Sequence, residues 1–377
     1  MKIRFVGFIA GLTLAAALTG CSGGTGSSQN PSTTTASAQQ RPSGSGSVWV
    51  ANEGGDSLSV IDTASNAVVT TLVGIKHPHN VQVSHDGSTV YAVSGSNLVV
   101  AIDASTYTVR AVAPTGQAPA HVIEAPSGRI YVTNANDGTV SVYEGPELSP
   151  VGEIALGDMP HGLRAAAGGS VIVVANTMAG RLDLIDPATD QLTGSVPVGT
   201  APAQVAVTAD GRYAFSGITD PPAVVKVDLV SRTVVGSVPV PTAPVQLYLT
   251  QDQRTVLSAD QGTLEKPGHT VSVIDTAAMT LRGTVTTGSG PHGVVIDASG
   301  TRAWVTNTFD DTVSVIDLTN LAAAATLAVG DEPNGISFSP RPPAAPPAAN
   351  VTLNIAATPA ETPATGHNPT TGHGHGH

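Results

Sequence analysis

Residues 130–134 read Ile-Tyr-Val-Thr-Asn, residues 304–307 read Trp-Val-Thr-Asn, and residues 312–317 read Thr-Val-Ser-Val-Ile-Asp. Short runs rich in β-branched and aromatic residues, each ending in Asn or Asp, are typical of β-strands followed by turns. Related runs recur along the chain, in units that each begin with a proline followed by an apolar run. These prolines are 41 to 47 residues apart, at Pro78, Pro119, Pro160, Pro202, Pro244, Pro291 and Pro333. The sequence therefore contains seven copies of one unit.

An apolar or aromatic residue followed by an acid forms a second marker with the same spacing. The acids are Asp62, Asp103, Glu144, Asp186, Asp228, Asp275 and Asp317. A side chain that recurs in every copy serves the repeat, so we interpret these acids as caps on the following turn and not as catalytic groups. Asn52, Asn134, Asn176 and Asn307, which end second strands, have the same interpretation.

Each unit contains four predicted strands. In the fourth unit, which begins at Pro202, residues 205–208 and 213–216 form a hairpin around the turn at 209–212, and residues 224–228 and 233–238 supply the other two strands. Four antiparallel strands in each of seven units, with no helical periodicity, predict an all-β, seven-bladed β-propeller.

The two ends of the repeat region predict how the ring closes. The chain enters at residues 48–50 in a second-strand position and leaves at 336–339 in a first-strand position. The N- and C-terminal strands are therefore expected in one blade, which removes open sheet edges.

The segments quoted above, together with Pro291-His292-Gly293-Val294, resemble the repeat of the YVTN β-propeller family over residues 47–340. The resemblance implies the propeller fold. Related propellers include surface-layer, adhesion and periplasmic binding proteins as well as haem d1 enzymes, quinoproteins and lactonases. Two function classes thus stay open: a binding or interaction module, and a propeller enzyme or cofactor carrier.

Residues 1–20 have the layout of a secretory signal, with Lys2 and Arg4 before an apolar run. The run ends in Leu18-Thr19-Gly20-Cys21, which resembles the lipobox of bacterial lipoproteins and implies lipidation of Cys21. Residues 21–46 are rich in Ser, Thr and Gly and are expected to form a flexible tether. We therefore expect an exported protein, lipid-anchored to a bacterial membrane and facing the periplasm or the cell exterior.

The composition and the absence of catalytic motifs limit the classes of partner and function that the chain can have. The chain has 16 Lys and Arg against 28 Asp and Glu, so no basic surface is available for nucleic acid. It contains no G-x-S-x-G elbow, H-E-x-x-H motif or phosphate loop, which favours a non-catalytic module, and we assign no catalytic residue. We expect a monomer with a protein or small-ligand partner.

Histidines follow four of the anchor prolines. In a four-stranded meander this position lies at one mouth of the central channel, so we expect His79, His121, His161 and His292 to converge there. Neutral imidazoles from neighbouring blades can bind a divalent metal ion, and protonated ones an anion. The alternative is that each imidazole bonds a backbone carbonyl and fixes its own loop.

Residues 341–377 change to a Pro- and Ala-rich linker followed by a His-rich tail. The apolar patch at 351–357 is expected to add a strand or to dock on the ring. Alternating Gly and His residues on a pliable backbone can bind Cu, Zn or Ni, and the candidate ligands are His367, His373, His375 and His377. A solvated tail without a metal is the alternative.

Two further departures from the repeat remain. Residues 261–269 contain an insertion on the predicted histidine face, and Glu265, Lys266 and His269 are its candidate partner-binding residues; a neutral insertion is the alternative. In first strands, Glu124 and Arg164 stand where most copies have apolar or small residues, and we expect them to form a structural ion pair.

Overall fold

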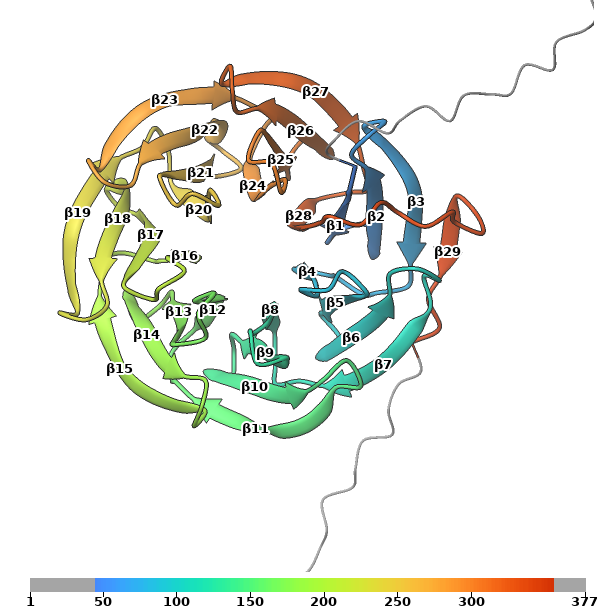
Figure 1. Ribbon diagram of the computed structural model, residues 1–377, viewed down its shortest axis with the longest axis horizontal. Helices are drawn as coiled ribbons and strands as arrows, with labels where there is room; N and C mark the ends of the chain where they lie inside the picture. The colour runs from blue at the N-terminus through green and yellow to red at the C-terminus, as the bar shows by residue number, and fades with distance from the viewer. Residues whose placement is uncertain (1–44, 356–377) are drawn as a thin grey trace, which may run out of the picture. The chain divides into compact units, whose positions relative to one another are not determined.

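The computed structural model describes residues 45–355, which form seven four-stranded antiparallel sheets around a central channel (Figure 1). Each blade runs from an inner strand at the channel to an outer strand at the rim. The described residues contain no helix long and apolar enough to cross a membrane. The predicted all-β, seven-bladed propeller is confirmed.

The strands are given from the inner to the outer position. Blade 1 comprises β28 (Pro333–Ser339), β1 (Ser47–Asn52), β2 (Ser57–Asp62) and β3 (Ala67–Val73); blade 2, β4 (Val81–Val83), β5 (Thr89–Ser94), β6 (Leu98–Asp103) and β7 (Val109–Pro114); blade 3, β8 (Pro119–Glu124), β9 (Arg129–Asn134), β10 (Thr139–Glu144) and β11 (Ser149–Ala155); blade 4, β12 (Pro160–Ala165), β13 (Ile172–Asn176), β14 (Arg181–Asp186) and β15 (Gln191–Pro197). Blade 5 comprises β16 (Val205–Val207), β17 (Tyr213–Thr219), β18 (Pro222–Asp228) and β19 (Thr233–Pro239); blade 6, β20 (Pro244–Leu249), β21 (Thr255–Gly262), β22 (Pro267–Asp275) and β23 (Thr280–Thr286); blade 7, β24 (Pro291–Ile296), β25 (Arg302–Asn307), β26 (Thr312–Asp317) and β27 (Ala322–Ala328).

Blade 1 closes the ring by pairing the two ends of the repeat region. Strand β1 pairs antiparallel with β28, placing Val48 opposite Phe338 and Val50 opposite Ile336. This is the expected closure, with N- and C-terminal strands in one sheet. The pairing gives β1 a hydrogen-bonded partner on both sides, β28 and β2, and joins the two ends of the repeat region in one sheet.

Hydrophobic side chains between neighbouring blades form the core. The second and third strands of each blade are almost wholly buried, whereas outer strands such as β27 are mostly exposed. Trp304 of blade 7 stacks on Phe338 of blade 1, with ring centroids 6.0 Å apart. The blades are therefore held face to face by burial of apolar surface.

The recurring polar residues have the capping roles predicted for them. Asp103 accepts hydrogen bonds from the backbone N–H groups of Ser105 and Thr106, at 2.8 and 3.0 Å. The buried Asn134 donates from Nδ2 to Thr139 and Ser141, both at 2.9 Å. Both residues stabilise turns of the scaffold, which removes them from the candidate functional groups.

The chain beyond the last repeat returns to the rim of blade 1. Strand β29 (Asn350–Thr352) pairs parallel with β3, as the apolar patch led us to expect. Leu353 is 5% exposed and packs in the same core cluster as Leu72 and Tyr107. The Tyr107 hydroxyl donates to the Ala344 carbonyl at 2.7 Å, so this segment is fixed to the propeller.

The docked segment should stabilise the whole ring. We expect Leu353→Ala to lower the free energy of unfolding by about 2 kcal/mol or more, because it leaves a cavity beside Leu72. The exposed neighbour Asn354 offers a matched control, since Asn354→Ala removes no buried contact. Urea denaturation of both variants measures the difference; equal midpoints for Leu353→Ala and the wild type would show that the segment adds no stability.

Candidate metal centre

The repeat itself explains how histidines reach the channel mouth. The prolines at the start of β8, β12 and β24 supply no N–H, which suits the first residue of a strand. The register between each first and second strand then shifts just after the proline, as in the shift between Pro160 and Leu163. Such a bulge redirects side chains, and here it lies at the positions of His121, His161 and His292.

The structure brings all four anchor histidines together. The ring centroid of His79 lies 5.5 Å from that of His121, 5.1 Å from that of His161 and 6.1 Å from that of His292. His121 and His161 are 4.9 Å apart. One ring nitrogen from each of His79, His121 and His161 lies within 4.8 Å of the other two. Four blades thus place their imidazoles around one point.

Glycine beside a histidine permits this close approach. A Cβ atom on Gly162 would meet Oε1 of Gln204 and the Ala203 carbonyl oxygen, both on the next blade. The Gly162 N–H instead donates to that carbonyl at 2.9 Å. The residue after His161 is therefore restricted to glycine by the spacing of the inner strands.

The hydrogen bonds of the imidazoles show which nitrogens are free. His161 Nδ1 donates to the Ala203 carbonyl at 2.9 Å, and His79 Nδ1 lies 3.1 Å from Oε2 of Glu53. Each contact assigns the proton to Nδ1 and leaves the Nε2 lone pair unused. His79 Nε2 is buried and has no hydrogen-bond partner among the described residues. This nitrogen is a candidate metal ligand.

His121 is held in a different state. The Gln204 side-chain amide donates to its Nδ1 at 3.2 Å, while Oε1 of Gln204 accepts from the Val205 N–H at 2.8 Å. These bonds make His121 Nδ1 an acceptor and place its proton on Nε2. His121 would therefore offer Nε2 to a metal ion only if the Gln204 amide turned over and the imidazole proton moved to Nδ1.

Glu53 is the functional residue that the sequence analysis missed. It lies in the connection between β1 and β2, and its carboxylate accepts hydrogen bonds from His79 and from the Asn334 side-chain amide. An acid here departs from other copies, which have Ala135, Thr177 or Thr308 after the strand-ending asparagine. That departure was the available signal.

Burial sets the charge of the cluster. It is the largest influence on the pKa of His161 and His292, and with the repulsion of neighbouring histidines it lowers these values to about 4 and about 3. The pKa of His121 is lowered well below its usual range for the same reasons. Burial alone would raise the pKa of Glu53, but the hydrogen bond and charge of His79 and the Asn334 amide lower it to about 2. The site thus combines the neutral imidazoles of His121, His161 and His292 with the ionised carboxylate of Glu53.

A solvent-accessible depression of about 430 Å³ leads to the cluster, with Glu53, His79, Met159 and His161 in its wall. Imidazole nitrogens with a carboxylate behind one of them are a donor set for Zn, Cu or Ni. Zinc–nitrogen bonds of about 2.0–2.1 Å place tetrahedral ligand atoms roughly 3.4 Å apart. The nitrogen–nitrogen separations, which are at most 4.8 Å, would therefore shorten by up to about 1.4 Å around an ion.

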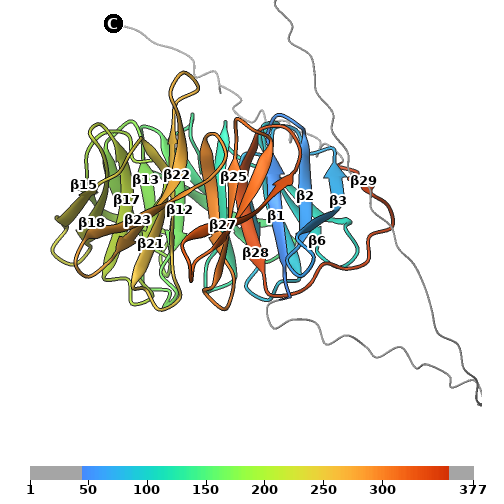
Figure 2. The same ribbon diagram turned by 90° about the horizontal axis from the view of Figure 1, so that it is seen from above.

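The other predicted site residues are not part of this cluster. Glu265, Lys266 and His269 are exposed on the β21–β22 hairpin, which projects from the ring (Figure 2). This hairpin lies at the end of blade 6 where β20 begins, because Pro244 pairs with Asp260. The insertion extends the strand ladder, with Gly262 opposite Pro267, and does not form an irregular loop. Cys21, His367, His373, His375 and His377 lie outside the described residues.

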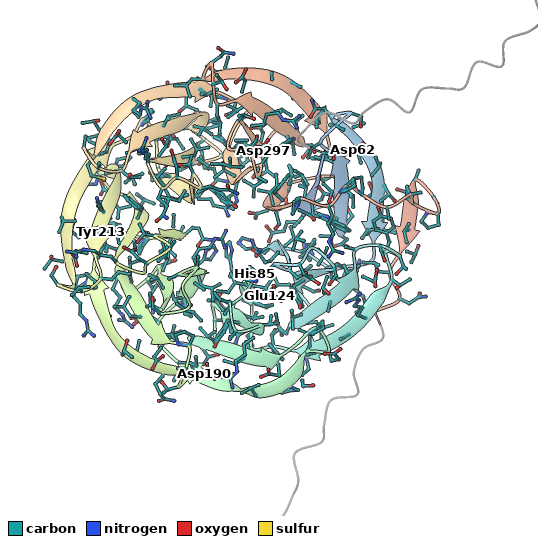
Figure 3. All side chains as sticks on the ribbon, viewed as in Figure 1. Asp62, His85, Glu124, Asp190, Tyr213 and Asp297 are labelled. Atoms are coloured by element: carbon teal, nitrogen blue, oxygen red, sulfur yellow. The ribbon has the colours of Figure 1, made fainter. Side chains whose placement is uncertain are left out.

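The prediction that Glu124 and Arg164 form an ion pair was wrong. Glu124 accepts from the backbone N–H of His85 and lies 2.7 Å from its Nδ1, so it turns toward the preceding blade. Figure 3 shows His85 and Glu124 next to each other near the channel. The contact raises the pKa of His85. Arg164 has no ion pair with any of the described residues.

No protein-family model and no curated protein matches this sequence. Solved structures that match it are propellers of low sequence identity. A functionally unknown protein from Desulfotomaculum acetoxidans matches with a TM-score of 0.68 and 15% identity, covering 78% of this chain and 99% of its own. A putative 6-phosphogluconolactonase from Bacteroides uniformis has a TM-score of 0.66 at 15% identity, covering 78% and 99%. Kuenenia stuttgartiensis hydrazine synthase has 0.63 at 20% identity, covering 70% and 90%. These likenesses show the fold.

Glu53 should tune metal affinity through His79. We expect Glu53→Gln to weaken zinc binding about 10- to 100-fold in protein truncated after residue 355, because the anchor that orients His79 and raises its basicity is lost. Glu265→Gln is the matched control, since this acid lies on the same face away from the cluster. Calorimetric zinc titration compares the variants; equal weakening by both would contradict a specific role for Glu53.

The lowered pKa values of His161 and His292 predict that zinc bound at the cluster is retained at acidic pH. Ordinary imidazoles protonate below pH about 6.5, but His161 and His292 stay neutral down to pH about 4 and about 3. Protein truncated after residue 355 should therefore retain zinc at pH 5.5, whereas a peptide of residues 356–377 should release it. Equilibrium dialysis at pH 7.5 and 5.5 measures both, and parallel losses would refute the assignment.

Proposed function

We propose that this chain is an exported, lipid-anchored YVTN-type β-propeller that binds a divalent transition metal ion at one channel mouth. The observation that carries the proposal is the set of three imidazole nitrogens within 4.8 Å, with His79 Nε2 buried and unpartnered. Buried polar atoms normally have partners, so an orphaned nitrogen facing other imidazoles is best explained as a ligand.

The alternative, that each imidazole only fixes its own loop through a backbone carbonyl, explains part of this geometry. His161 does bond a backbone carbonyl, as a loop-fixing imidazole would. That bond uses Nδ1, however, and leaves Nε2 directed away from the loop. Orientation of one nitrogen by a hydrogen bond so that the other is available is the usual arrangement of a metal-ligating histidine.

The donor set favours zinc, copper or nickel over magnesium and calcium, which prefer oxygen ligands. His121, His161 and His292 contribute neutral nitrogens, His79 contributes its unpartnered Nε2, and Glu53 supplies negative charge beside the cluster. In our proposal the tail histidines His367, His373, His375 and His377 form a second, more exposed metal-binding element. Lipid on Cys21 would hold both at the cell envelope, with the face carrying Glu265, Lys266 and His269 open to a partner.

The cluster is tested by removing its ligands. In protein truncated after residue 355, His79→Ala/His161→Ala/His292→Ala should abolish the tight 1:1 binding of zinc or copper seen by titration calorimetry. The matched control replaces the three exposed propeller histidines, His77, His85 and His269, with alanine and should bind as the wild type does. Undiminished binding by the cluster variant, or loss only in the control, would overturn the proposal.

A further inference from the structure

The opposite mouth of the channel contains a second cavity. It has a volume of about 330 Å³, and Ile123, Arg164, Leu247, Tyr248, Ile336 and Phe338 are among the residues that line it. Arg164 is three residues beyond His161 on β12, which corresponds to about 10 Å along the strand. The cavity is therefore separate from the metal centre, although both are built on the inner strands.

Arg164 is a partly buried cation without a carboxylate partner among the described residues. Its Nη1 donates only to the Leu163 carbonyl, at 3.1 Å. Several other arginines of the propeller pair with acids, including Arg181 with Asp183 at 2.7 Å and Arg212 with Asp228 at 3.2 Å. A desolvated guanidinium without a counter-ion costs free energy, and burial accordingly lowers the pKa of Arg164.

The nearest candidate counter-ion is already engaged. Glu124 lines the same cavity, but its carboxylate accepts two hydrogen bonds from His85. His85 therefore holds the Glu124 carboxylate, and Glu124 in turn raises the pKa of His85. When His85 is protonated, the Glu124–His85 pair carries little net charge. Arg164 leaves the cavity electropositive under that condition.

Tyr248 supplies a second polar group across the channel. It belongs to β20 of blade 6, and its hydroxyl has no hydrogen-bond partner among the described residues. Burial raises the pKa of Tyr248 and lowers that of Arg164, and the electrostatic interaction between the two groups opposes both shifts, so they lie close enough to influence each other. Apolar side chains such as Leu247 and Ile336 form part of the remaining wall, and Gln82, Glu124 and Ser337 add polar groups to it.

We propose that this cavity binds a small organic anion whose carboxylate pairs with Arg164 and accepts a hydrogen bond from Tyr248. A guanidinium matches a carboxylate through two parallel N–H donors, which gives both charge compensation and orientation. The apolar part of the wall, which includes Leu247 and Ile336, suits the carbon skeleton of such a ligand better than it suits an inorganic ion. The volume lies at the lower end of that found for small-molecule sites, which limits the ligand to a few carbon atoms or one ring.

Calorimetric titration of the full-length protein with acetate, succinate, benzoate and inorganic phosphate tests this assignment. We expect 1:1 binding of at least one carboxylate, weakened about tenfold or more in Arg164→Gln and about two- to tenfold in Tyr248→Phe. Arg164→Lys should bind between Arg164→Gln and the wild type, because charge is kept and the two-pronged contact is lost. Arg254→Gln, which removes an exposed arginine elsewhere, should bind as the wild type does.

Three results would overturn the proposal. The first is the absence of saturable carboxylate binding up to ~10 mM, a range that covers Kd values weaker than 1 mM. The second is binding of phosphate but of no carboxylate, and the third is carboxylate binding that is unchanged in Arg164→Gln. Thermal unfolding shows whether that variant folds. If it does not, Arg164→Lys and Tyr248→Phe decide the question, and wild-type affinity in both overturns the proposal.

Discussion

The closure of the ring in blade 1 is the constraint on which the candidate metal centre depends. Pairing of β1 with β28 brings the start and the end of the repeat region together. Glu53 follows β1 and Asn334 lies in β28, so the two groups that surround His79 come from opposite ends of the chain. The Glu53 N–H also donates to the Glu332 carbonyl at 3.0 Å, which fixes the turn that carries the carboxylate. The anchor of His79 therefore forms only when the propeller is complete.

Burial then decides the chemistry at this mouth. Three imidazoles, those of His121, His161 and His292, lie within about 6 Å of the His79 ring, and desolvation favours the neutral forms of these three. Glu53 remains ionised because His79 and Asn334 hydrogen-bond to it. Neutral nitrogens and one carboxylate favour a divalent cation over protons. At the other mouth, Arg164 gives the channel the opposite preference, so the two ends of one channel present complementary ligand chemistry.

The fold and the position of the histidines could be predicted from the sequence because the seven copies of the repeat can be aligned with one another. The period fixed the blade count and the strand order, and the position of His161 relative to Pro160 placed its side chain at the mouth. The sequence could not predict which contacts compete for a given group. Glu124 and Arg164 lie on neighbouring inner strands, one repeat position apart, and Glu124 bonds the His85 backbone of the preceding blade instead of Arg164. Likewise, the amide of Gln204 fixes the tautomer of His121, and that depends on distances that no pattern encodes.

A zinc anomalous difference map from crystals of the protein truncated after residue 355 tests the central claim most directly. The account predicts one strong peak at the channel mouth, about 2.0–2.1 Å from Nε2 of His79 and of His161. It also predicts that the carboxylate of Glu53 stays on His79 Nδ1. Peaks confined to exposed histidines such as His77 or His269, or no peak beside His79, would contradict it.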